Sequence, residues 1–122
     1  MDKSLKFYHE PDHVYVMLPV TDSVAQIITW VESIFVYSTE QGVSHLIIDT
    51  REYSERFSVT GYMEIGKYAA LKKPVSLKKV ANITAERNVS HDRFFENVVR
   101  NRGINYKYFT DYDQALIWLR EH

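Results

Sequence analysis

Alternating apolar and polar residues open the chain and predict a β-hairpin. The segments LKFYH (5–9) and HVYVMLP (13–19) both alternate, and a period of two is typical of strands with one buried face. The intervening EPD (10–12) places proline at the second position of a turn, where its fixed φ is favourable. We therefore expect two antiparallel strands, and we expect one face of the second to carry Val14, Val16 and Leu18.

Helical spacing replaces this alternation after residue 22. Apolar residues then recur every three or four positions, at Val24, Ile27, Ile28, Val31, Ile34 and Phe35. Ser23 followed by Gln26 is similar to a capping box, and Gly42 is a residue type that commonly ends a helix. We expect a helix over residues 23–41 with this stripe buried. Trp30 falls off the stripe, so we expect it to be partly exposed and a candidate for self-association.

Three more strands, each followed by a helix, complete the pattern. The strands are predicted at HLIID (45–49), KVANIT (79–84) and YKYF (106–109). The first of these reads as a strand buried on both faces of a parallel sheet. The helix after the first of these strands is expected to end before Pro74. The next is expected to run from a Ser90 cap to Gly103, and the last to begin at Thr110 with Asp113 in a capping-box-like pattern.

This order of elements specifies a fold class. Strands separated by helices are joined by crossovers, which have one hand in nearly all proteins. We therefore predict a single α/β domain over residues 1–122, in the order β-β-α-β-α-β-α-β-α. Its sheet is mostly parallel with an antiparallel hairpin at the N-terminal edge, and helices lie on both faces.

Composition excludes several classes of function. The 122 residues carry a formal net charge of −1 and no cysteine, so we expect no nucleic-acid partner, no disulfide framework and no cysteine nucleophile. The one basic cluster, four lysines around Pro74, is expected to be a solvated connector. No stretch approaches the roughly 18 apolar residues of a membrane span, and the N-terminus lacks a signal-peptide pattern. We expect a soluble, cytoplasmic protein.

The C-terminal part of the chain carries a family signal. FFENVVRNRGINYKYFTDYDQALIWL (94–119) has a helix, an Arg-Gly turn, an aromatic strand, a polar cap and a final helix with tryptophan. This arrangement resembles the SpoIIAA-like proteins of the STAS superfamily. A weaker match extends through most of the chain. The resemblance implies a non-enzymatic regulatory module that binds a protein partner or another copy of itself.

Anti-sigma factor antagonists of this superfamily have an Asp-Ser-Ser-Gly-like or Asp-Ser-Thr-Gly-like turn, in which a hydroxyl accepts phosphate. The matching segment here is Phe57-Ser58-Val59-Thr60-Gly61. Thr60 and Gly61 match the end of the motif, whereas Ser58 replaces the aspartate and Val59 replaces the first hydroxyl residue. The resemblance implies a regulatory site at Ser58, Thr60 and Gly61. A plain helix cap explains Ser58 equally well.

Ligands of doubly wound sheets bind beyond the carboxyl ends of the strands. That rule selects polar residues after three strands: Asp49, Thr50 and Arg51, then Thr84, Glu86 and Arg87, and last Thr110 and Asp111. Among these, Asp49, Arg51 and Arg87 would bind a small anion or a polar loop of a partner. The loop DTREYSER (49–56) is the densest polar segment of the chain. We therefore expect the partner surface around residues 50–65, with a merely solvated loop as the alternative.

The sequence also offers residues for two other kinds of site. Some relatives of the fold enclose apolar molecules between helix and sheet, and a small apolar ligand or lipid would be lined here by Tyr62, Met63, Tyr68, Phe94 and Phe95. Ordinary core packing explains the same residues. Neither a metal at His9 and His13 nor a catalytic set among Ser58, His91 and Asp92 has the required spacing, so we expect no cofactor, no metal and no enzymatic activity.

Overall fold

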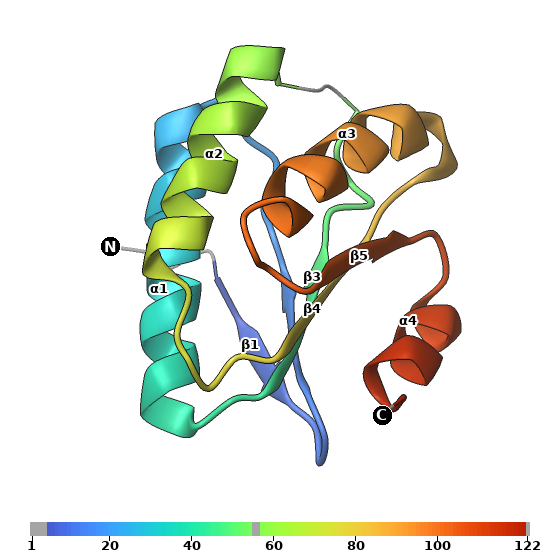
Figure 1. Cartoon of the computed structure of the whole chain (residues 1–122). Coiled ribbons are helices and arrows are strands. Elements are labelled where there is room, and N and C mark those ends of the chain that lie inside the picture. The colour runs from blue at the N-terminus through green and yellow to red at the C-terminus, as the bar shows by residue number, and fades with distance from the viewer. Residues whose placement is uncertain (1–4, 55–56, 122) are drawn as a thin grey trace.

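The computed structural model describes residues 5–54 and 57–121, which form five strands and four α-helices (Figure 1). The strands are β1 (Phe7–His9), β2 (Val14–Met17), β3 (His45–Asp49), β4 (Lys79–Ile83) and β5 (Tyr106–Phe109). The helices are α1 (Val24–Gln41), α2 (Val59–Lys72), α3 (Val89–Arg100) and α4 (Tyr112–Leu119), with a short 3-10 helix, η1 (Glu86–Asn88), before α3.

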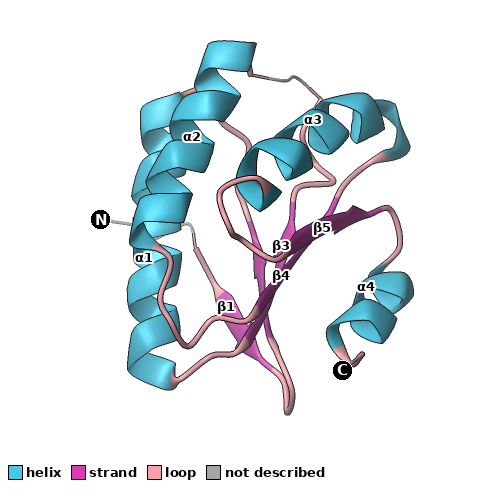
Figure 2. Ribbon diagram, in the orientation of Figure 1, coloured by secondary structure: helices cyan, strands magenta, loops and turns pink. Residues whose placement is uncertain are grey.

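The strands lie in the sheet in their sequence order, β1-β2-β3-β4-β5. β1 pairs with β2 antiparallel and every other pair is parallel, which confirms the predicted fold class and edge hairpin. Because each crossover moves one strand further in the same direction, α1, α2 and α3 all cover one face. The other face is covered by α4 (Figure 2).

Two apolar clusters hold these layers together. The larger lies between the sheet and the first three helices, and the smaller joins Ile47, Ala81 and Ile83 of the sheet to Ala115 and Leu119 of α4. Neighbouring residues of one strand contribute to different clusters because successive side chains point to opposite faces. This double burial explains why apolar residues stand next to one another at positions 46–48 of β3 and 80–81 of β4 instead of alternating with polar ones.

Local signals in the sequence set both ends of α1. The Ser23 hydroxyl accepts a hydrogen bond from the Gln26 N–H (3.1 Å), and Gly42 has a left-handed φ of 64°. Trp30 corrects one prediction, because it is only 5% exposed and belongs to the larger core. Trp30 lies three residues after Ile27 and four before Ile34, and these three are the most buried apolar residues of α1. The centre of the buried face is therefore shifted towards Trp30 relative to the predicted stripe.

Two helix starts also differ from the prediction. Asn88, not Ser90, precedes α3, because η1 leads directly into the helix and leaves Ser90 in its first turn. Asp111, not Thr110, caps α4, and its carboxylate accepts from the Asp113 N–H (3.0 Å). Gly103, just beyond α3, has a positive φ of 92°, which is typical of a glycine that ends a helix. Each strand and helix is otherwise where periodicity placed it, within a few residues.

Candidate partner-binding surface

Asp49, the last residue of β3, is fully buried and closely bonded. Its two carboxylate oxygens accept hydrogen bonds from Arg51 Nε (3.1 Å) and Nη2 (2.8 Å), and the Arg51 backbone N–H also donates to it (2.9 Å). The Tyr15 hydroxyl of β2 donates to Oδ2. Since these groups occupy the carboxylate, Asp49 contributes to the surface by fixing the position of Arg51.

Electrostatics keep this cluster charged. Burial alone would raise the pKa of Asp49, but the hydrogen bonds from Arg51 and Tyr15 outweigh burial and bring the pKa below its ordinary value. Burial, followed by the hydrogen bond to Asp49, raises the pKa of Tyr15 to about 12. The same carboxylate raises the pKa of Arg51. Near neutral pH the cluster is therefore an ion pair with a neutral tyrosine.

The loop after β3 is anchored from several sides. Tyr53 is 2% exposed, and its hydroxyl donates to the Pro19 carbonyl (2.6 Å). The Tyr53 carbonyl accepts from Arg87 Nη2 and Asn88 Nδ2, both at 2.9 Å. The Thr50 N–H donates to the Ile83 carbonyl (2.8 Å). Bonds to β4 and η1 thus hold the loop backbone, and the Tyr53 side chain anchors it to Pro19, just after β2. The side chains of Arg51, Glu52 and Ser54 are exposed.

Arg87 lies beside Arg51, as the strand-end rule predicts, but it has a different partner. Its guanidinium donates to the backbone carbonyls of Arg51 (3.3 Å) and Tyr53 (2.9 Å). The structure therefore brings Asp49, Arg51 and Arg87 together around one loop. Two of the three hold that loop in place, and Arg51 extends a partly exposed guanidinium towards solvent.

The start of α2 presents the predicted hydroxyl residues. Ser58 is the cap, with its Oγ accepting from the Gly61 N–H (3.1 Å), and both Ser58 and Thr60 are exposed. Gly61 is buried, and a Cβ there would lie 3.0 Å from Val24 Cγ2. The glycine therefore lets the start of α2 approach the start of α1 closely. Residues 55–56, which complete the polar loop, lie outside the described part of the chain.

The residues expected to enclose an apolar ligand do not share one cavity. Tyr62 and Phe95 line a space of about 100 Å³ between α1–α3 and the sheet, which is small beside the roughly 300–1,000 Å³ of ordinary ligand pockets. Tyr68 lines a separate surface hollow, and Phe94 is 36% exposed. Met63 is half-buried on α2. This geometry gives the ligand-carrier alternative no support.

The candidate residues for catalysis or metal binding also differ in burial and in the partners they contact. Asp92 accepts from the Thr84 hydroxyl (2.6 Å) and is buried, whereas His91 is exposed. His13 bonds to the Tyr112 hydroxyl of α4 (2.8 Å), and His9 faces Tyr37 of α1 on the opposite side of the sheet. Within the described residues, no group of three or more His, Asp or Glu side chains could hold a metal ion.

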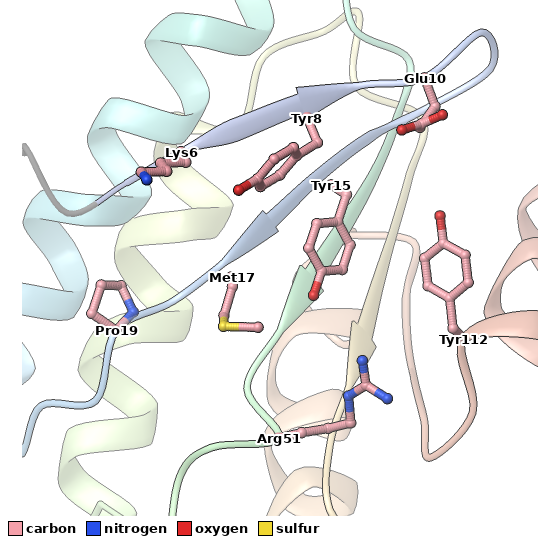
Figure 3. A pocket seen from close by; sticks show the side chains of 8 residues that line it. All are labelled: Lys6, Tyr8, Glu10, Tyr15, Met17, Pro19, Arg51 and Tyr112. Atoms are coloured by element: carbon pink, nitrogen blue, oxygen red, sulfur yellow. The ribbon is translucent and has the colours of Figure 1, made fainter.

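An open groove on the α4 side of the hairpin was not predicted. It encloses about 630 Å³ and is lined by Lys6, Tyr8, Glu10, Tyr15, Met17, Pro19, Arg51 and Tyr112 (Figure 3). Tyr8 and Met17 are 51% and 42% exposed. The alternation of the hairpin places its lining residues on one face, which is a usable signal. This face has no covering helix because α4 packs elsewhere on the sheet. The periodicity of the sequence does not determine where α4 packs.

Comparisons with known proteins rest on structure. No protein-family model matches the sequence, and no curated protein matches it either. A serine-to-glutamate variant of RsbS from Moorella thermoacetica has a similar structure, with a TM-score of 0.61 and 15% identity over 97% of this chain and 96% of that one. No helix in the described residues is long and apolar enough to cross a membrane. The likeness over nearly all of both chains shows that this protein has a SpoIIAA-like STAS fold.

Proposed function

We propose that this chain is a non-enzymatic regulatory module that binds a protein partner. The partner surface, called here the loop surface, consists of the exposed side chains of Arg51, Glu52, Ser54, Ser58 and Thr60. The observation that carries the proposal is the anchored loop. Its backbone is bonded to β4 and η1, and the Tyr53 side chain ties it to Pro19, just after β2. Its polar side chains Arg51, Glu52 and Ser54 are exposed.

Preorganisation explains why such a loop suits recognition. Ordering a flexible loop on binding costs free energy, and a loop that is already held avoids much of that cost. The neighbouring charges of Arg51 and Glu52 would select a polar partner through electrostatic complementarity more than through buried area. The lack of cysteine in the sequence suits a reducing compartment, and we place this interaction in the cytoplasm.

Thr60 is the residue through which such an interface would be regulated. It lies in the first turn of α2, where negative charge is stabilising by roughly 0.3–1 kcal/mol. A phosphate there would be tolerated by the fold and would act on the partner's surface. Thr60→Glu should therefore keep the unfolding free energy within about 1 kcal/mol of wild type and weaken partner binding.

Site-specific photo-crosslinking in the cells that make the protein tests the surface. A crosslinking residue is placed at Glu52, Ser54 or Thr60, and a control is placed at Val75, which is 87% exposed near the opposite end of α2. We expect one common protein adduct from the three loop positions and none from Val75. The same adduct from all four positions, or no adduct at any loop position, would contradict the proposal.

A further inference from the structure

The outer edge of β1 offers backbone groups to another strand. Within residues 5–54 and 57–121, β1 pairs only with β2. The Glu10 N–H donates to the His13 carbonyl (2.9 Å), so the backbone of Glu10 faces β2. Because direction alternates along a strand, Tyr8 also faces β2, and Phe7 and His9 direct their N–H and C=O groups outward. An edge of this kind is a template for strand pairing.

Side chains on this strand divide cleanly between the two faces. Lys6, Tyr8 and Glu10 line the open groove (Figure 3). Phe7 and His9 point the other way, and both rings meet Tyr37 of α1, with Phe7 stacked at a centroid distance of 4.0 Å. The groove face of β1 therefore carries one exposed aromatic ring with a positive charge on one side and a negative charge on the other.

We propose that two copies of this chain pair through β1, antiparallel and centred on Tyr8. Phe7 of each copy then exchanges two backbone hydrogen bonds with His9 of the other. The two Tyr8 side chains meet at the two-fold axis, where the pair is of the closely spaced type. The two sheets join into one continuous sheet with an isologous interface.

Charge complementarity selects a second copy as the occupant. In this register Lys6 of each copy lies opposite Glu10 of the other, so the strand is complementary to itself when reversed. Opposite charges facing each other across strands are stabilising. A foreign strand would need an acidic and a basic residue at the same spacing. On the α1 side, Leu5, Phe7 and the 52%-exposed Val36 add apolar surface beside the edge.

Arg51 of the loop surface lines the same groove, but the residues that pair across this interface all belong to the β1 strand and its two flanking positions. Each proposal can therefore fail without the other. Sedimentation velocity of the purified full chain at about 1–100 μM, the range of weak association, measures self-association directly. Lys6→Glu and Glu10→Lys should each weaken it by roughly tenfold, because two attractive pairs become repulsive. The double variant restores both pairs in reverse and should return to within about threefold of wild type. Lys78→Glu, a charge reversal on an exposed lysine away from β1, is the control and should have no effect.

A backbone variant provides an independent test. The outward N–H of His9 is not needed by the hairpin, so His9→Pro should leave the monomer folded by circular dichroism and remove the dimer. A wild-type protein that is monomeric at about 100 μM would overturn the proposal. So would a dimer that survives His9→Pro, or a double charge variant that stays as weak as the single ones.

Discussion

Arg51→Ala should destabilise the protein in a way that depends on pH. The change removes the guanidinium hydrogen bonds of Nε (3.1 and 3.2 Å) and Nη2 (2.8 Å) from a carboxylate that is fully buried. Hydrogen bonds to charged groups contribute roughly 1.5–3 kcal/mol each. The Arg51 side chain is 46% exposed, so solvent screening reduces that figure. We expect a loss of about 2 kcal/mol in unfolding free energy at pH 7.

The pH dependence follows from the direction of the Asp49 pKa. In the wild-type protein this pKa is lowered, so the stabilisation is present above the unfolded value of about 3.9 and is lost as pH falls through the folded value. Without the Arg51 side chain the largest contribution that lowers this pKa is lost, so burial moves the pKa of Asp49 upward from its wild-type value. The difference in stability between the two proteins should therefore be largest near pH 7 and should shrink below about pH 4.

Urea unfolding from pH 3 to pH 7 measures this difference. Arg51→Lys keeps the charge without the two-pronged geometry and should fall between wild type and alanine. Arg93→Ala, a change at an exposed arginine of α3, controls for the loss of a surface charge. A loss below about 0.5 kcal/mol at pH 7, which is the range of ordinary surface changes, would refute the reasoning. So would a loss of equal size at pH 3 and pH 7.

Three further predictions concern packing and capping. Trp30→Ala should cost about 3–5 kcal/mol in chemical denaturation, against less than about 0.5 kcal/mol for the exposed Ile117→Ala. Gly66→Ala should cost about 1–3 kcal/mol, because its Cβ would lie 2.6 Å from Val98 Cγ1, and a gain in thermal stability would contradict this packing. Ser58→Ala should cost about 1 kcal/mol by removal of the cap, and an unchanged melting temperature would show that the cap contributes nothing.

The sequence determines most element boundaries because their signals are local. Ser23, Gly42 and Ser58 act within a few residues of their own positions, and β3 extends one residue beyond its apolar run, 46–48, at each end. Trp30 was misplaced because three-residue and four-residue spacings fit two overlapping stripes on α1. Only contacts with α2 and the sheet decide which stripe is buried.

Long-range side-chain contacts account for what the sequence did not predict. Tyr15 reaches Asp49 across 34 positions, and Arg87 reaches the Tyr53 carbonyl across a similar separation. The rule that ligands bind beyond the carboxyl ends of the strands predicted that Asp49, Arg51 and Arg87 lie in one region. It could not distinguish a residue that is exposed to a partner from one that holds the loop beneath it, because both kinds are polar and both follow strands.

The open groove is a consequence of strand order. When strands are added in sequence order with crossovers of one hand, every crossover helix covers the same face, so α4 must cover the other face alone. An eight-residue helix that packs on β3, β4 and β5 reaches β2 through Tyr112 and leaves the groove face of β1 uncovered. Lys6 and Glu10 keep that bare strand charged, and charge on an edge strand normally discourages pairing. Here the two charges have opposite signs and flank one tyrosine. The same charges that disfavour pairing with most strands are therefore complementary to an antiparallel second copy of β1.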